Sequence, residues 1–266
     1  MEIEKWLAYC QRYYTPRTIR LYRSCITQFE TYLSNDGNQL TSEAIDAYIG
    51  DRLAVGWSKR YVNCNLSVIK SYCRWCSEHY HETNQASSIP MLHEDPPKQR
   101  VLSDEEYQKI LAAISGRDKD IIVFLANTGL RVSEFTSLTW EDITSDFKSL
   151  SVVGKGRKVR MIPLNQTCRD ILAKYKSQGM TGRLPFSRMH RVNVGKICMR
   201  VAKKAGIAQF GPHACRHCFA TQLMRRGVSI YKISKILGHA SIAVTEKVYV
   251  HFCQQDVLGI TDCLDN

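Results

Sequence analysis

The sequence has no long apolar run and no stretch typical of an export signal. None of its hydrophobic segments approaches the roughly 18 residues that a membrane-spanning helix needs. Residues 1–14 mix acidic and basic side chains and lack the apolar segment of a secretory signal. We therefore expect no association with a membrane and a location in the cytoplasm.

Signatures of nucleotide and metal chemistry are also missing. The turn at 154–158, GKGRK, lacks the spacing of a Walker loop. No carboxylates cluster in the way that holds Mg²⁺, which argues against a metal-dependent nuclease or a transposase with an acidic triad. No internal repeat or low-complexity tract is present. We expect an activity that requires no cofactor.

Acidic side chains are in the minority. The chain of 266 residues has 25 aspartates and glutamates against 37 lysines and arginines, which gives a formal net charge of +12. Such an excess indicates a polyanionic partner. Composition alone does not separate DNA from RNA or from an anionic membrane surface.

The 11 cysteines are scattered through helical patterns in an odd number, which favours reduced thiols over a disulfide framework. Two pairs have the spacing of metal ligands: Cys73 and Cys76, followed by His79 and His81, and Cys215 and Cys218. A zinc site needs four ligands that converge, usually from outside a single regular helix. Small core residues are the favoured interpretation for both pairs, and no metal is predicted.

Apolar periodicity and turn residues divide the chain into two domains. Residues 1–84 are predicted to form a helical domain with helices near 16–33, 42–53 and 58–79. Residues 85–100 are polar, contain Pro90, Pro96 and Pro97, and are predicted to be a linker. A second domain spans 101–266, where Ser103 to Glu106 predict a helix cap.

The second domain is predicted to be helical apart from one hairpin. Helices are expected at 118–127, 164–176 and 191–205, with Gly129 ending the first in a left-handed conformation. Strands at 150–153 and 158–162 flank a turn that carries Lys155. That lysine is either an arm that reaches into a groove or an ordinary basic hairpin tip. The fold class is mainly α with a small antiparallel β-sheet in the C-terminal domain.

The stretch at 211–249 carries the densest set of reactive side chains. It contains two imidazoles, a guanidinium and a phenol: His213, His239, Arg216 and Tyr249. Pro212 predicts a helix start, which places His213 and Arg216 on one face near an end that suits a phosphate. An isolated HxxR pair is more often part of a basic surface helix, so this stretch alone leaves both interpretations open.

Two more segments complete a recognisable order. TGLR at 128–131 supplies an arginine, and GKG at 154–156 supplies a lysine ahead of the HxxR, LGH and tyrosine motifs. In this order the chain resembles the tyrosine recombinases, the phage-integrase and Xer-type family, over roughly residues 100–250. The six positions that carry the resemblance are Arg131, Lys155, His213, Arg216, His239 and Tyr249.

The resemblance implies a site-specific DNA recombinase that works through a covalent 3′-phosphotyrosine on Tyr249. A free phenol has a pKa of about 10, so His213 is expected to act as its base. Lys155 is expected to protonate the leaving oxygen, and His239 to bind the scissile phosphate. The interval from His239 to Tyr249 is ten residues, one more than is usual in the family. The intervening segment is therefore expected to be bulged, looped or set on another helix face.

Two arginines are suited to the charge that develops in this reaction. Arg131 and Arg216 can each offer a forked donor pair to the non-bridging oxygens of the phosphate. Glu134 lies one helical turn from Arg131 and is expected to hold its guanidinium. Other basic residues are equally well explained by DNA contact or by a solvated face: Arg17, Arg20, Lys59, Arg60, Lys70, Arg157 and Lys158.

The family also implies partners. We expect double-stranded DNA with an inverted-repeat core site, a homotetramer acting on two DNA sites, and a tail at 250–266 that packs on a neighbouring protomer. The sequence does not identify a directionality factor. Two other functions stay open: a type IB topoisomerase-like DNA-relaxing enzyme, and a catalytically silent DNA-binding accessory protein.

Overall fold

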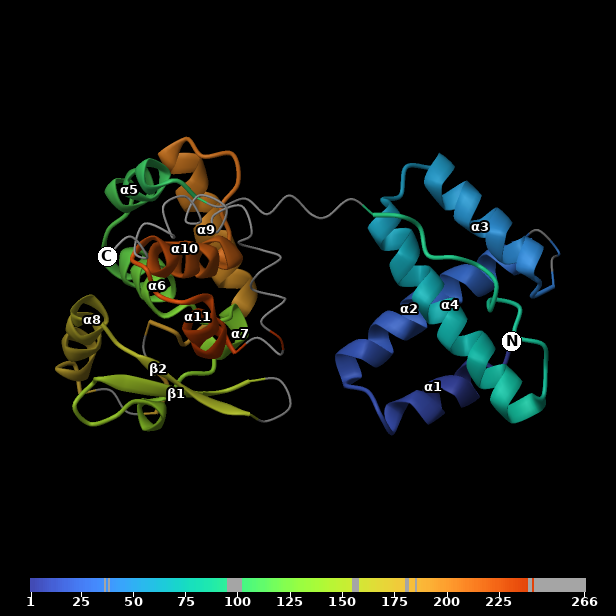
Figure 1. Cartoon of the computed structure of the whole chain (residues 1–266), viewed down its shortest axis with the longest axis horizontal. Helices are drawn as coiled ribbons and strands as arrows, with labels where there is room; N and C mark the ends of the chain where they lie inside the picture. Colours follow the sequence, from blue (N-terminus) through green and yellow to red (C-terminus); the bar gives the residue numbers. More distant parts are fainter. Residues whose placement is uncertain are drawn as a thin grey trace, which may run out of the picture. The chain divides into compact units, whose positions relative to one another are not determined.

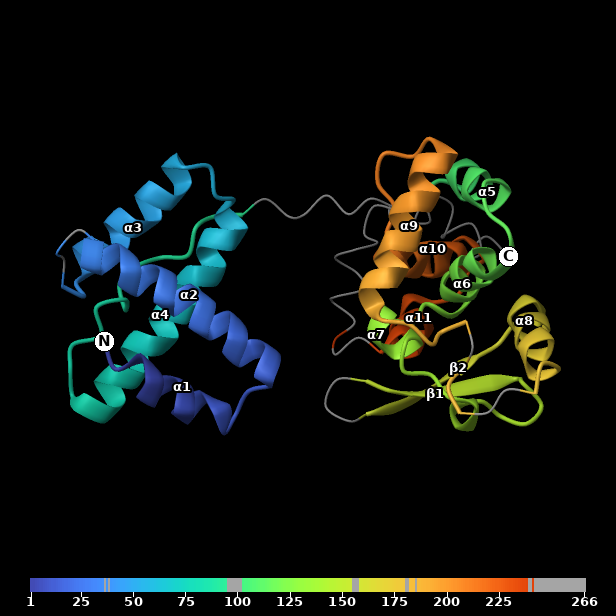
Figure 2. The same cartoon turned by 180° about the vertical axis from the view of Figure 1, so that it is seen from behind.

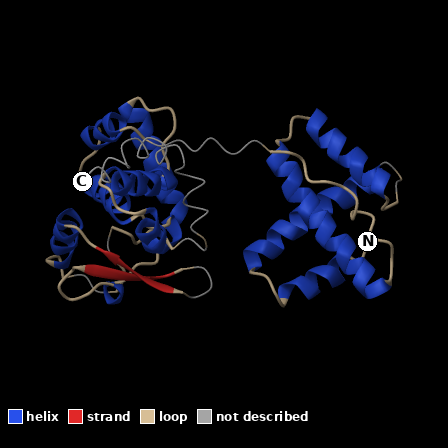
Figure 3. Cartoon of the chain, in the orientation of Figure 1, coloured by secondary structure: helices blue, strands red, loops and turns tan. Residues whose placement is uncertain are grey.

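The computed structural model divides into two compact units, Met1–Pro97 and Lys98–Asn266 (Figure 1). It describes residues 1–35, 37, 39–94, 102–154, 158–179, 182–184, 186–238 and 241. Both units consist mainly of helices, and the second also contains a two-stranded antiparallel sheet (Figure 3). The predicted fold class is therefore confirmed. Within the described residues, no helix is both long enough and apolar enough to span a membrane.

The first unit is a bundle of helices around an apolar core. Its elements are α1 (Ile3–Gln11), α2 (Pro16–Asn35), α3 (Ser42–Ala54) and α4 (Lys59–Tyr80). In both views α2 crosses α4 (Figures 1 and 2). Trp6, Phe29 and Ile69 are almost fully buried between these helices. Thr41 and Ser58 cap α3 and α4 by accepting backbone N–H groups, as their residue types favour.

The segment predicted to begin a linker packs instead against the first unit as far as residue 94. Ala86 and Ile89 are buried in its core. Asn63, itself 6% exposed, binds Leu92 twice: its amide donates to the Leu92 carbonyl at 2.9 Å, and its side-chain oxygen accepts the Leu92 N–H at 2.8 Å. The buried Asn63 of α4 thus supplies hydrogen-bond partners to the backbone N–H and carbonyl groups of a segment without regular secondary structure.

The paired cysteines are core residues. Cys73 and Cys76 lie inside the first unit, and Cys215 and Cys218 lie inside the second. Burial raises the pKa of the Cys73 thiol to about 12, so the side chain stays neutral and packs as a small apolar group. Among the described residues, no three histidines, cysteines or carboxylates are grouped so that they could hold a metal ion.

The second unit has α6 packed against neighbouring helices and a β-hairpin at one edge. Its elements are α5 (Asp104–Ala112), α6 (Gly116–Thr128), α7 (Val132–Phe135), the 3₁₀ turn η1 (Trp140–Asp142), β1 (Ser149–Val153), β2 (Val159–Pro163), α8 (Gln166–Lys176), α9 (Arg191–Ala205), α10 (Pro212–Arg225) and α11 (Ile230–Leu237). The rings of Phe124, Phe135 and Phe186 meet in its core. The predicted cap of α5 is a complete capping box between Ser103 and Glu106.

The hairpin follows the predicted strands closely. β1 and β2 pair from Ser149 opposite Pro163 to Val153 opposite Val159. The Gly154 N–H donates to the Lys158 carbonyl at 2.8 Å and continues the ladder towards the turn. Residues 155–157, with the predicted Lys155 and Arg157, lie outside the described residues.

Candidate functional site

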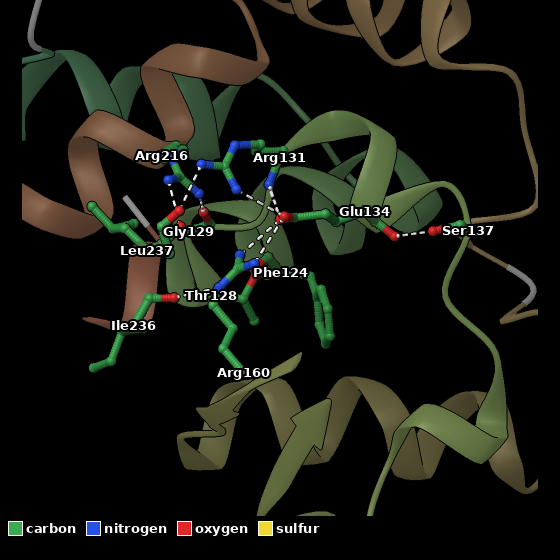
Figure 4. Close-up of polar contacts among 11 residues, drawn as sticks. Phe124, Thr128, Gly129, Arg131, Glu134, Ser137, Arg160, Arg216, Ile236 and Leu237 are labelled. Carbon is green, nitrogen blue, oxygen red and sulfur yellow. Dashed lines mark hydrogen bonds and ion pairs between the residues drawn. The ribbon is translucent and has the colours of Figure 1, made fainter. Parts of the chain in front are cut away.

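The HxxR pair lies at the start of α10, which begins at Pro212 as predicted. His213 is exposed, whereas Arg216 is 6% exposed. The Arg216 guanidinium donates from Nη1 to the Gly129 carbonyl at 2.6 Å and from Nη2 to the Leu237 carbonyl at 2.7 Å (Figure 4). A charged group this deeply buried needs such partners. Arg216 therefore joins the end of α6 to the end of α11.

Arg131 also contacts the C-terminal end of α11. It precedes α7, and its Nη2 donates to the Gly238 carbonyl at 3.0 Å while its Nη1 donates to Glu134 Oε1 at 2.9 Å (Figure 4). The predicted contact with Glu134 is thereby confirmed. The Arg131 side chain is 32% exposed, so part of its guanidinium faces solvent. Arg131 and Arg216 thus bind successive carbonyls, those of Gly238 and Leu237.

Gly129 makes the approach of these elements possible. It ends α6 with a left-handed conformation, φ +62°, as predicted. A Cβ at this position would lie 2.5 Å from Cδ1 of Phe219 and 2.8 Å from Cδ2 of Leu237. A larger residue would therefore separate α10 and α11 from the turn that leads to Arg131.

Glu134 is the anionic centre of the site. Burial raises the pKa of its carboxyl, but hydrogen bonds and charge from Arg160 and Arg131 outweigh burial and lower the pKa to about 2. Because this value lies below the usual 4.5, the carboxylate's contribution to stability is present above about pH 4.5. That contribution is lost as the pH falls towards 2.

Arg160 also belongs to the site, although its sequence motif did not predict this. It lies on β2 and holds Glu134 through two bonds, from Nη1 to Oε1 at 2.9 Å and from Nη2 to Oε2 at 2.8 Å. Its Nε donates to the Ile236 carbonyl at 2.7 Å. A signal was available, because Arg160 alternates with the buried Ile162 on the inward face of the strand. A charged residue on such a face requires a partner.

His213 and His217 differ in their surroundings. His213 lines a hollow of about 660 Å³ beside α9, together with Met199, Lys203 and Phe210. His217 lies one turn further along α10, where burial, with help from the charges of His213 and Arg216, lowers its pKa. Burial therefore favours the neutral form of the His217 imidazole.

The remaining predicted catalytic residues fall outside the described part of the chain. They are Lys155, His239 and Tyr249, and the tail at 250–266 also lies outside the described residues. The helix α11 ends at Leu237, and Gly238 follows it in a left-handed conformation. His239 is the next residue in the sequence.

The predicted DNA contacts differ in exposure. Exposed side chains are found at Arg17, Arg20, Lys59, Arg60 and Lys158. Lys70 is half-buried, and its ammonium donates to the Ala86 carbonyl at 2.7 Å. This bond ties Lys70 to the docked segment of the first unit, so its ammonium has a structural role. Arg157 lies outside the described residues.

The arrangement is suited to binding an anion such as a phosphate. An arginine presents five N–H donors in a planar fork, and bonds to backbone carbonyls hold this fork in place in both Arg131 and Arg216. The bound carbonyls fix both guanidinium groups before a ligand arrives, and such preorganisation makes charge stabilisation effective. The site therefore offers permanent positive charge at a fixed position.

Comparisons with known proteins agree on one family. Residues 100–255 match the model of the phage integrase family. Tyrosine recombinase XerD of Listeria monocytogenes serotype 4b (strain F2365) is 28% identical, over 91% of this chain and 90% of the relative. Tyrosine recombinase XerA of Pyrococcus furiosus is 31% identical, over 86% of this chain and 82% of the relative.

Solved structures share the fold. A lambda integrase fragment, solved as a dimer bound to a COC′ core site, has a TM-score of 0.77 at 20% identity, over 92% of this chain and 97% of that one. The integrase of transposon Tn1549, in complex with transposon right end DNA, has a TM-score of 0.74 at 20% identity, over 94% and 95% of the two chains.

Proposed function

This chain belongs to the phage integrase family and is a tyrosine-type site-specific recombinase, and on that premise we propose how it cuts and rejoins DNA. Tyr249 attacks a phosphodiester, forms a bond to the 3′ phosphate and releases a 5′ hydroxyl. The 5′ hydroxyl of a partner strand then attacks the phosphotyrosine and restores a phosphodiester. Each step exchanges one phosphate ester for another, so no ATP is required, and in this proposal arginines supply the positive charge that a metal ion would otherwise provide.

The placement of Arg131 and Arg216 is the observation that carries this proposal. Both guanidinium groups bind the end of α11 through successive carbonyls. In the reaction, the two guanidinium groups donate hydrogen bonds to the two non-bridging oxygens of the scissile phosphate. Negative charge grows on those oxygens as the five-coordinate transition state forms, and the two arginines stabilise it.

Three other side chains handle protons and position the phosphate. His213, exposed at the start of α10, accepts the proton of Tyr249 as the phenol attacks. Lys155 gives a proton to the departing 5′ oxygen. His239 follows Gly238 in the sequence and donates a hydrogen bond to the phosphate. These roles match the residue types that the reaction needs.

Lys155→Ala should be rescued by a substrate in which sulfur replaces the 5′ bridging oxygen. A thiolate leaves without a proton, so cleavage of this substrate no longer needs the lysine. The measurement is the single-turnover cleavage rate of each variant on the oxygen and sulfur substrates.

Arg131→Ala is the matched control for the lysine variant. Its charge acts on the non-bridging oxygens, which the sulfur substrate leaves unchanged, so its rate should stay low on both substrates. Equal rescue of the two variants would show that the roles of Lys155 and Arg131 are assigned wrongly.

The DNA is held by both units in this proposal. Residues 1–84 act as a core-binding domain and residues 101–266 as the catalytic domain. The exposed Arg17, Arg20, Lys59 and Arg60 of the first unit contact DNA phosphates, and Lys158 of the hairpin does the same in the second.

Assembly follows the pattern of recombination between two sites. Four protomers act on two inverted-repeat core sites in the cytoplasm, and the tail at 250–266 packs on a neighbouring protomer. The tail carries Val257, Leu258, Ile260 and Leu264, an apolar surface too small to form a core of its own.

Plasmids with one or two core sites test the function directly. The core site is first located by a footprint of the pure protein on DNA flanking its gene. The protein should exchange strands between two sites on one plasmid without Mg²⁺ or ATP. Relaxation of a plasmid irrespective of its core sites, with no exchanged product, would favour a type IB topoisomerase. Binding without any cleavage would favour a silent accessory protein.

A further inference from the structure

Arg160 uses every nitrogen of its guanidinium within the protein. Nη1 and Nη2 hold the two oxygens of Glu134, and Nε holds the Ile236 carbonyl. Its side chain is only 11% exposed, against 32% for Arg131. A bidentate bond to a carboxylate is geometrically demanding and is a use to which arginine is better suited than lysine. Arg160 is therefore fixed by the fold and is not placed to bind DNA itself.

The end of α11 is held by arginines along its last carbonyls. The final carbonyls of a helix lack partners within the helix and form its negative pole, so they favour cationic donors. Arginines from β2, α10 and the start of α7 supply them here: Arg160 binds Ile236, Arg216 binds Leu237, and Arg131 binds Gly238. We call this set the arginine clamp.

Gly238 is shaped to the clamp as well. It is left-handed, with φ +66°, and a Cβ there would lie 2.9 Å from Cδ and 3.0 Å from Nε of Arg160. A side chain at 238 would thus push Arg160 from the Ile236 carbonyl. Gly238 therefore allows the left-handed end of the helix and leaves room for the Arg160 side chain next to it.

We infer that Arg160 is a positioning residue of the recombination site, acting on Arg131 through Glu134 and through the end of α11, whose carbonyls Arg131 and Arg216 also bind. This inference rests on the proposed function. Glu134 binds both arginines, so the place of Arg131 depends on the carboxylate that Arg160 holds. Within the described part of the chain, Glu134 forms ion pairs with Arg131 and Arg160.

Arg160→Lys keeps a positive charge but cannot make all three bonds. It should slow formation of the covalent adduct on a nicked core-site duplex about 10- to 100-fold, because displacements on the order of 1 Å cost up to about 100-fold. Arg169→Lys is the matched control. Arg169 also donates from Nε to a backbone carbonyl, that of Leu164 at 3.0 Å, but lies outside the clamp. The control should cleave at the wild-type rate.

Two readouts separate positioning from DNA contact and from general damage. Loss of one phosphate contact reduces the slope of log binding constant against log salt concentration by about 0.9. Arg160→Lys should leave both this slope and the affinity for DNA unchanged. Hydrogen exchange should accelerate in the peptide covering α11 and Gly238 and stay unchanged in α9.

Gly238→Ala tests the same clamp without substituting Glu134 or either of the arginines that bind it. It should also slow adduct formation, and the double variant with Arg160→Lys should lose no more than the slower single variant, since both remove one arrangement. Gly206→Ala is its control for backbone strain. Gly206 ends α9 with φ +68°, and a Cβ there would meet nothing within 4 Å.

Four results would contradict the positioning role of Arg160. Wild-type cleavage by Arg160→Lys, unchanged exchange at α11, a smaller salt slope, or multiplied losses in the double variant would each overturn the inference. If Arg160→Lys does not fold, slow cleavage by Gly238→Ala with normal binding supports the inference, and normal cleavage overturns it. Failure of the wild-type protein to form an adduct would instead overturn the proposed function.

Discussion

Tyr249→Phe should abolish cleavage and leave DNA binding unchanged. The substitution removes only the phenolic oxygen, which is the proposed nucleophile, while binding depends on lysines and arginines elsewhere in the chain. We expect wild-type affinity in a gel-shift titration at several salt concentrations and no covalent adduct at any time of incubation.

Tyr231→Phe is the matched control for the nucleophile. Tyr231 is the nearest rival in the sequence, and it lies on α11 with 54% of its surface exposed. We expect this variant to form the adduct at the wild-type rate. Loss of binding by Tyr249→Phe would indicate a structural tyrosine, and residual cleavage would exclude Tyr249 as the nucleophile.

Arg216→Lys should reduce cleavage by about 10²–10³-fold, the usual cost of one donor to the developing charge. It should also reduce the free energy of unfolding, because the buried carbonyls of Gly129 and Leu237 lose their fixed partner. Each unsatisfied buried group costs about 1–3 kcal/mol. Single-turnover cleavage and urea unfolding measure the two effects separately.

Arg225→Ala provides a comparison on the same helix. Arg225 pairs with Asp104 and is 44% exposed, so its loss should change the free energy of unfolding by less than about 1 kcal/mol. Its cleavage rate should not change. An Arg216→Lys variant that cleaves like wild type would contradict the proposed role, even if the variant were less stable.

Much of the fold follows from local sequence rules. The capping box at Ser103, the proline that begins α10 and the left-handed Gly129 all depend on residues within a few positions of one another. The contact of Arg131 with Glu134 is equally local, three residues apart on one turn. These features could be predicted because their partners are close in the chain.

Features that depend on distant partners were not predictable in the same way. Arg160 binds residues 26 and 76 positions away, so neither its local sequence nor the hairpin pattern names its partners. Residues 85–100 are predicted to be a linker because their sequence is mostly polar and rich in proline. The docking of this segment depends on Asn63, which lies 29 positions from Leu92 and is buried in α4.

The central claim is that Tyr249 becomes covalently joined to a 3′ phosphate. A nicked core-site duplex releases a short fragment after cleavage and so traps the covalent complex. Digestion with trypsin and mass spectrometry then identify the modified peptide and the linkage. We predict a single adduct on Tyr249 through the 3′ phosphate. An adduct on Tyr231, a 5′ linkage, or no adduct from protein that binds its core site would contradict the account.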